Sequence, residues 1–287
     1  MKAKPFLKWA GGKRSLLPEI RKRLPEGIAS GKLKCYVEPF LGGGAVFFDL
    51  AQRFTFSSIY LADSNRYLMA AYKAICFDIE NVLGALAMLD YQYRRASTMV
   101  EKRMLYYKVR NEFNRVSSLD KTAELIFLNK TCFNGLYRVN SKGEFNTPFG
   151  YYADPFICDV VNLRAVSGVL KSTWIEDADF TEATFGIPMK AHFFYFDPPY
   201  RPLPSKDGFC QYTDSGFTDA DQERLCRVFR KLDKKGAFLM FSNSDTGDGF
   251  FEDLYAGYRI ERVRTRSTIS CRGETRGVRN EILIMNY

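Results

Sequence analysis

A short acidic and aromatic motif, Asp197-Pro198-Pro199-Tyr200, directly follows the apolar run of residues 193–196. Pro198 fixes its own φ angle and keeps Asp197 out of the helical region, and neither proline carries an N–H donor. An ionised Asp197 only accepts hydrogen bonds, so its side chain and the Pro198 carbonyl can together accept both hydrogens of an exocyclic –NH2 group. Tyr200 offers a face for stacking on a planar base. The motif therefore predicts a site for an aromatic amine, with Asp197, Pro198 and Tyr200 as candidate catalytic residues.

An amine on an aromatic ring is a poor nucleophile because its lone pair is delocalised into the ring. Two acceptors that bond to its hydrogens draw the nitrogen towards tetrahedral geometry and localise the lone pair. The nitrogen can then attack a methyl group that a sulfonium holds in line with it. Alignment and electrostatics supply the catalysis, and neither a strong base nor a metal is needed. This chemistry suits a chain whose one histidine, His192, borders an apolar run and is expected to be a strand residue.

A glycine turn and a downstream acid predict a nucleoside-bearing cofactor. Residues 38–44 end in three glycines, which let the backbone approach a ligand closely, and a helix is expected to start near Ala45. Asp63 ends the next predicted strand, where an acid binds ribose hydroxyls in nucleotide-binding folds. Lys13 follows two glycines, but residues 7–14 lack the first glycine and the Ser/Thr of a phosphate loop. Lys13 is therefore interpreted as lying near a cofactor carboxylate.

The elements that must position these residues alternate between strands and helices. The expected buried parallel strands are residues 35–40, 58–62, 193–196, 236–241 and 281–285. The expected helices between them are residues 15–24, 68–89 and 219–232. This alternation is typical of a doubly wound α/β sheet, in which ligands bind beyond the carboxyl ends of the strands.

A second lobe interrupts this pattern. Helical periods in residues 85–113 and 122–129 precede a polar, aromatic loop at residues 134–152. We therefore predict a discontinuous α/β domain of residues 1–66 and 163–287, with a helical domain of residues 67–162 inserted into it.

Composition restricts the partners of this 287-residue chain. Its net charge of +9, from 42 Lys+Arg against 33 Asp+Glu, favours a polyanion. Basic residues gather at 13–23 and in the tail 259–279, where Arg262, Arg264 and Arg266 alternate as on one side of a hairpin strand.

No apolar run is long enough to span a membrane or act as a signal peptide, so a cytoplasmic protein is expected. Seven scattered cysteines without a C-x-x-C pair predict neither disulfides nor a metal site.

Five motifs in order give the chain a family resemblance. They are FLKWAGGK at residues 6–13, EPFLGGG at 38–44, NGLYR at 134–138, GEFNTPFG at 143–150 and DPPY at 197–200. Together they resemble the Dam family of bacterial and phage DNA adenine methyltransferases, the D12 class with the alpha order of motifs. The resemblance covers nearly the whole chain. It implies a Rossmann-like, S-adenosylmethionine-dependent methyltransferase with an inserted helical target-recognition domain. Adenine N6 in double-stranded DNA, at GATC, would be its target, and a monomer or weak dimer its state.

The resemblance also implies roles for residues at matching positions. The cofactor-binding positions are Trp9, Ala10, Gly11, Lys13, Phe40, Gly42, Gly44, Asp63, Asp179, Phe180 and Asp197. The DNA-binding positions are Lys8, Phe133, Asn134, Leu136, Arg138, Pro148 and Tyr152.

Among the DNA-binding positions, Lys8 and Arg138 match guanine readers, and an arginine in a loop can donate a bidentate pair to guanine O6 and N7. Phe133 and Asn134 match residues that enter the duplex around the flipped adenine. The chain departs from the family pattern at Thr147, Tyr151 and residues 130–132. These departures affect the expected phosphate contacts rather than the expected reaction.

Several alternatives stay open. The acceptor amine is also compatible with cytosine N4 or with adenine in RNA. A catalytically silent DNA-binding module is disfavoured by the intact motif at residues 197–200, and protein glutamine methylation by the basic tail and the loop around Arg138. The sequence distinguishes neither a solitary enzyme from a restriction–modification partner nor a cellular from a phage origin.

Overall fold

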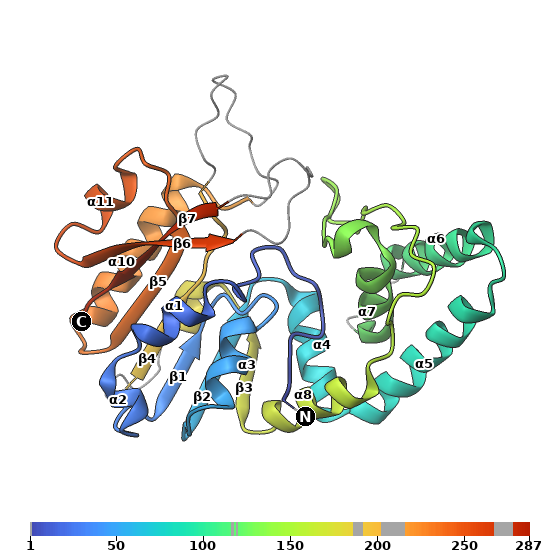
Figure 1. Ribbon diagram of the computed structural model, residues 1–287, viewed down its shortest axis with the longest axis horizontal. Coiled ribbons are helices and arrows are strands. Elements are labelled where there is room, and N and C mark those ends of the chain that lie inside the picture. Colours follow the sequence, from blue (N-terminus) through green and yellow to red (C-terminus); the bar gives the residue numbers. More distant parts are fainter. Residues whose placement is uncertain (1, 116–117, 119, 186–191, 202–215, 267–277) are drawn as a thin grey trace. The chain divides into compact units, whose positions relative to one another are not determined.

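The computed structural model describes residues 2–115, 118, 120–185, 192–201, 216–266 and 278–287 (Figure 1). Two of the seven cysteines, Cys210 and Cys271, and two arginines of the basic tail, Arg272 and Arg276, lie outside the described residues. The described elements are α1 (Leu17–Lys22), α2 (Glu26–Ala29), β1 (Cys35–Glu38), α3 (Ala45–Ala51), β2 (Ser58–Asp63), α4 (Arg66–Phe77), α5 (Ile79–Arg95), α6 (Met99–Arg115), α7 (Thr122–Thr131), the 3-10 turn η1 (Phe133–Gly135), α8 (Val160–Leu170), β3 (Thr173–Asp177), α9 (Phe180–Ala183), β4 (His192–Phe196), α10 (Asp219–Asp233), β5 (Phe238–Ser244), α11 (Phe250–Leu254), β6 (Arg259–Arg266) and β7 (Val278–Met285).

Seven strands form one sheet with the order β3-β2-β1-β4-β5-β7-β6. β1 pairs in parallel with β2 and β4, and β4 pairs in parallel with β5. The predicted α/β fold with a largely parallel sheet is thus confirmed. Every residue of β1 and β4 is buried, as expected of parallel strands covered on both faces.

The expectation of a parallel strand at residues 281–285 is wrong, because β7 runs antiparallel to both β5 and β6. β5 and β6 are both antiparallel to β7 and therefore run in the same direction, and α11 lies in the connection between them. The chain passes from β6 to β7 within residues 267–277, which is short for a crossover connection. β7 therefore returns as the second strand of a hairpin.

The helical segments differ from prediction at their ends. One helix was expected over residues 68–89, but α4 ends at Phe77 and α5 begins at Ile79, with Asp78 non-helical between them at φ −141° and ψ 48°. α5 and α6 are separated by a capping box in which Glu101 accepts from the Thr98 backbone while Thr98 Oγ1 accepts from the Glu101 backbone. β3 was missed because only its central residue is buried, so it contains no apolar run.

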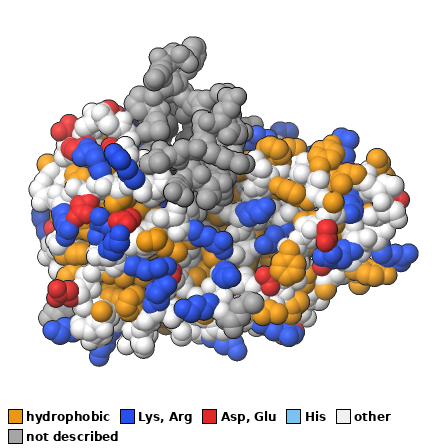
Figure 2. Space-filling view, viewed as in Figure 1, with side chains coloured by type: hydrophobic (Ala, Val, Ile, Leu, Met, Phe, Trp, Pro, Cys, Tyr) orange, Lys and Arg blue, Asp and Glu red, His pale blue; other side chains and the backbone are white. Residues whose placement is uncertain are grey.

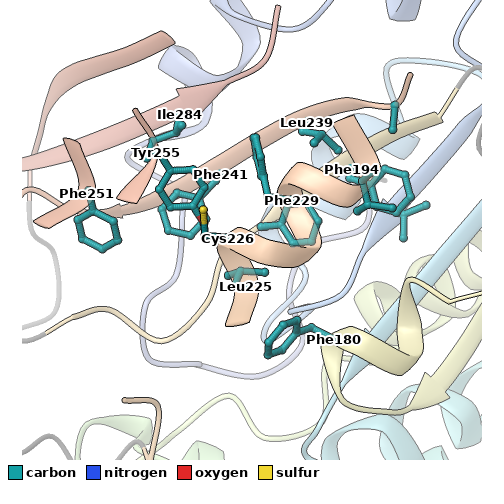
Figure 3. Close-up of a cluster of buried hydrophobic side chains, with 14 of the residues drawn as sticks. Phe180, Phe194, Leu225, Cys226, Phe229, Leu239, Phe241, Phe251, Tyr255 and Ile284 are labelled. Carbon is teal, nitrogen blue, oxygen red and sulfur yellow. The ribbon is translucent and has the colours of Figure 1, made fainter. Parts of the chain in front are cut away.

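The core beside the candidate catalytic motif is aromatic (Figure 3). α10 begins at a capping box between Thr218 and Asp221 and presents one apolar face to the sheet. The packed side chains include Phe194, Phe196, Leu225, Cys226, Phe229, Leu239, Phe241, Phe251, Tyr255 and Ile284. This packing fixes the ends of β4 and β5, where the site residues lie.

The described chain forms two compact units. Unit 1 comprises Met1–Gly12, Gly42–Gln52 and Asn65–Asp177, and unit 2 comprises Lys13–Leu41, Arg53–Ser64 and Ala178–Tyr287. The helical segment thus shares its unit with the N-terminal residues and the end of the glycine turn. The functional domain boundaries after residues 66 and 162 stay a prediction. No helix in the described ranges is long and apolar enough to cross a membrane.

Phe229→Ala should lower the free energy of unfolding by about 3–5 kcal/mol, because it leaves a cavity in the core. Phe229 is fully buried and packs edge-on against Tyr255 and Tyr258, with ring centroids 5.3 Å and 5.0 Å away. Phe185 is 80% exposed, so Phe185→Ala is a matched control that should cost within about 0.5 kcal/mol. Urea unfolding followed by circular dichroism measures both, and equal losses would contradict the assignment of Phe229 to the core.

Candidate functional site

The carboxylate of Asp197 lies directly after β4 and is held on one of its two oxygens. Oδ1 lies 2.5 Å from Lys13 Nζ and accepts a hydrogen bond of 3.2 Å from Ser242 Oγ of β5. The Lys13 side chain is only 5% exposed and that of Asp197 17%. Among the described residues, no group bonds to Oδ2, so this oxygen stays available as an acceptor. The carbonyl of Pro198 likewise receives no hydrogen bond from the described part of the chain.

Tyr200 is held at its ring and at its hydroxyl. Lys13 Nζ lies 4.3 Å from the ring centroid, and the hydroxyl donates to Glu281 Oε2 at 2.6 Å. Glu281 Oε1 accepts in turn from Thr265 Oγ1 at 2.7 Å. Glu281 was not among the predicted site residues, and its signal in the sequence is an acid at the head of an apolar strand.

The backbone of residues 198–201 is fixed by polar side chains of β5 and α10. Asn243 Oδ1 accepts from the Arg201 backbone N–H at 3.1 Å, and Ser244 Oγ donates to the Arg201 carbonyl at 2.8 Å. Gln222 Nε2 donates to the Pro199 carbonyl at 3.3 Å. Because the prolines have no N–H, these side-chain bonds hold the described part of the loop. The polar end of the predicted strand 236–241 was the signal for this support.

Burial raises the pKa of Asp197 to about 6, and the carboxylate of Glu281 adds to the rise while the charge of Lys13 opposes it. Burial and the nearby carboxylates raise the pKa of Tyr200 well above its ordinary value. Tyr200 therefore stays a hydrogen-bond donor at neutral pH, whereas Asp197 loses its negative charge as the pH falls through about 6.

The candidate cofactor residues of unit 2 form a second group. Phe40 and Phe180 stack with ring centroids 5.2 Å apart. Asp63 ends β2, and its carbonyl accepts from the Ala178 N–H at 3.3 Å, which brings the segment containing Asp179 beside it. Carboxylates and aromatic rings thus lie at the carboxyl edge of the sheet, where the sequence placed them.

Asp179 is already engaged by protein groups. Its Oδ1 caps α9 through the Thr181 N–H at 3.0 Å, and Arg224 donates to both oxygens at 2.9 Å and 3.0 Å. Burial acts to raise the pKa of Asp179, but the bonds from Thr181 and Arg224 outweigh it, so the pKa is lowered. The guanidinium of Arg224 also lies 4.3 Å from the Phe180 ring centroid.

The glycines of the turn are explained by packing within unit 1. Gly44 has φ 71° at the start of α3, and a Cβ there would lie 2.7 Å from Tyr72 Oη. A Cβ at Gly42, with φ 48°, would lie 3.0 Å from Trp9 Cδ1. Both positions therefore need glycine for conformation and for space. Their approach to a cofactor stays a prediction.

The N-terminal candidates lie against the helical segment of unit 1. The Trp9 ring stacks on Tyr137 with centroids 5.1 Å apart, and Ala10 and Gly11 form the exposed turn that follows. Buried Asn129 of α7 accepts from the Lys8 N–H and donates to the Lys8 carbonyl, both at 2.8 Å, and donates to the Gly135 carbonyl at 2.9 Å. The structure thus joins Lys8 to the loop that starts at residue 133.

The remaining candidate DNA-binding residues lie in one antiparallel ribbon of unit 1, residues 133–152. Cys132 and Phe149 form an antiparallel bridge, and the Phe133 N–H donates to the Pro148 carbonyl at 2.8 Å. Phe133 is 46% exposed, and Asn134 has the left-handed backbone angles φ 54° and ψ 11°. Leu136 accepts from Thr147 Oγ1 at 2.9 Å. The Tyr152 ring lies 5.2 Å from Lys8 Nζ.

Basic side chains spread over the pictured face, and acidic side chains lie beside several of them (Figure 2). In β6, Arg262 and Arg264 are exposed while Val263 and Thr265 are buried, so the predicted alternation is confirmed for these residues. Arg262 pairs with Asp245 at 3.1 Å and also with Glu252, and Arg259 pairs with Glu261. Part of the charge of the tail is therefore compensated within the protein.

Comparison with known proteins defines the class. The model of the D12 class N6 adenine-specific DNA methyltransferases matches residues 9–269, and the chain belongs to this family. It is 46% identical over 294 residues to the type II methyltransferase M.MjaIII of Methanocaldococcus jannaschii, which covers the whole of both chains. It is 34% identical over 291 residues to the type II methyltransferase M1.LlaDCHI of Lactococcus lactis subsp. cremoris, which covers 99% of this chain and 95% of that protein. The DNA adenine methylase of Escherichia coli K12 is 31% identical over 285 residues, with 99% and 95% coverage.

The protein is therefore an adenine-specific DNA methyltransferase, and S-adenosylmethionine is its methyl donor. The groups of unit 2 suit such a ligand, which carries an ammonium, a sulfonium, ribose hydroxyls and an adenine ring. Asp63 and Asp197 are carboxylate acceptors, and the stacked pair of Phe40 and Phe180 presents aromatic surface. The individual contacts stay predictions.

The rate constant kcat/KM for methylation should fall as pH drops through about 6, because a protonated Asp197 loses an acceptor for the target amine. Activity is full above this pKa and lost below it. Lys13→Met should move this limb to higher pH, since the Lys13 charge holds the pKa of Asp197 down, whereas Lys13→Arg should leave it near 6. Measurements from about pH 5 to about pH 9 at saturating cofactor test this, and an unmoved limb in the Met variant would contradict the coupling.

Proposed function

We propose that this enzyme methylates adenine N6 within GATC in duplex DNA, with Asp197, Pro198 and Tyr200 receiving the flipped adenine. The observation that supports this best is the buried Asp197 carboxylate, held on Oδ1 by Lys13 and Ser242 while Oδ2 has no bond to a described residue. Tyr200, fixed through Glu281, supplies a rigid aromatic face beside it.

The protein groups act on the amine by orientation. One hydrogen of the adenine amine bonds to Asp197 Oδ2 and the other to the Pro198 carbonyl, which localises the nitrogen lone pair. Since Asp197 and Tyr200 are held in place before the base arrives, little reorganisation is needed at the reaction. The cofactor supplies, when bound, an electrophilic methyl group on its sulfonium.

The choice of GATC rests on the family resemblance and on the loop of unit 1. Arg138 and Phe133 are exposed, and half-buried Asn134 lies beside Phe133 in the turn η1 of the same ribbon. We assign Arg138 and Lys8 to guanines, and Phe133 and Asn134 to the space that adenine vacates, with Leu136, Pro148 and Tyr152 as further contacts. The proposed cofactor residues are Trp9, Ala10, Gly11, Lys13, Phe40, Gly42, Gly44, Asp63, Asp179, Phe180 and Asp197. A cytoplasmic location and a monomeric or weakly dimeric state stay predictions.

Asp197→Ala should lower the methyl-transfer rate by about 10²–10³ or more, because it removes a preorganised acceptor. An appreciable share of cofactor affinity should remain, since the other proposed cofactor residues are unchanged. Single-turnover methylation measures the first effect, and calorimetry with S-adenosylhomocysteine measures the second. Methyl transfer near the wild-type rate would refute the proposed role of Asp197.

Genomic DNA from a methylation-free host that expresses the chain should carry N6-methyladenine within GATC. Single-molecule sequencing reports the modified base and its context together. Methylated adenine in another context would overturn the GATC assignment alone, whereas methylated cytosine would overturn the choice of base.

A further inference from the structure

We infer that Asn146 is a positioning residue for base recognition, because it fixes the guanidinium of Arg138 in one orientation. Asn146 Oδ1 accepts from Arg138 Nε at 2.8 Å, and the Asn146 N–H donates to the Arg138 carbonyl at 2.9 Å. The two residues are thus joined through both backbone and side chain. This inference rests on the proposed function, in which Arg138 reads a guanine.

Asn146 is itself held rigidly by its two neighbours. Phe145 is buried, and its backbone N–H and carbonyl bond to the side chain of Asn114 of α6 at 2.9 Å and 3.0 Å. Thr147 is also buried, and its carbonyl accepts from the Tyr106 hydroxyl of α6 at 2.7 Å. Asn146 lies between them with a half-buried side chain. α6 therefore fixes the backbone from which Asn146 bonds to Arg138.

The bond selects how Arg138 presents its donors. A guanidinium has five N–H donors. It can form a bidentate pair either through its two terminal nitrogens or through Nε and one terminal nitrogen. Nε is occupied by Asn146, and neither terminal nitrogen bonds to a described residue. Arg138 is therefore restricted to the geometry in which its two terminal nitrogens donate to two acceptors, which matches guanine O6 and N7. Without Asn146, an exposed arginine has many rotamers and loses entropy on each productive contact.

The test compares kcat/KM on a GATC duplex with kcat/KM on a duplex altered at the outer base pair, and defines selectivity as their ratio. Arg138→Ala should lower selectivity about 5- to 100-fold. Asn146→Ala should lower it about 3- to 10-fold, the net effect of one ordinary intramolecular hydrogen bond. Asn146→Asp keeps the acceptor oxygen, so selectivity should be retained while affinity for both duplexes falls through phosphate repulsion. Asn111→Ala, at an exposed asparagine of α6, is the matched control and should change neither quantity.

A double variant separates positioning from an independent contact. In the Arg138→Ala background, Asn146→Ala should lower selectivity no further, because its effect acts through Arg138. Uniformly weaker binding to both duplexes by Asn146→Ala, with selectivity unchanged, would show a phosphate contact and overturn the inference. If Arg138→Ala itself leaves selectivity unchanged, the proposed role of Arg138 fails first. Thermal unfolding midpoints of all variants identify any loss that arises from unfolding.

Discussion

The ion pair between Lys13 and Asp197 is the interaction on which the candidate catalytic site depends. A carboxylate at this depth pays a desolvation penalty, which is visible in its raised pKa, and Lys13 offsets part of it. Lys13 also lies over the Tyr200 ring, so one ammonium organises both the acceptor and the stacking surface. Since β4 ends at Phe196 and the aromatic core holds that strand, Asp197 has little freedom to move towards solvent.

The support of this site comes from strands that follow it in the chain. Ser242, Asn243 and Ser244 at the end of β5 bond to Asp197 and Arg201, and Glu281 of β7 bonds to Tyr200. β7 reaches this position because it returns between β5 and β6. The antiparallel hairpin therefore supports the candidate catalytic site, because Glu281 of β7 holds the Tyr200 hydroxyl.

Unit 1 uses the side-chain amides of buried Asn129 and half-buried Asn114 for a comparable purpose. Asn129 joins Lys8 to the loop at Gly135, and Asn114 fixes the segment that carries Asn146. Buried polar side chains are costly unless they are fully bonded, and once bonded they specify one arrangement of the backbone. The exposed residues Phe133 and Arg138 lie on the loop that these two amides hold.

The fold class, the family and the candidate catalytic motif could be predicted from the sequence, because these depend on local patterns. Apolar runs ending in Asp63 and Asp197 predict parallel strands with ligand groups at their ends, and a rare tetrapeptide predicts its chemistry. β4 could be predicted because all of its residues are buried and form an apolar run. β3 has one buried residue and contains no such run, so it was not predicted. The tertiary structure alone decided the direction of β7, the bond from Glu281 to Tyr200 and that from Asn146 to Arg138. These join residues that are separated along the chain or lie on opposite sides of a hairpin, and spacing in a sequence does not record which side chains meet in space.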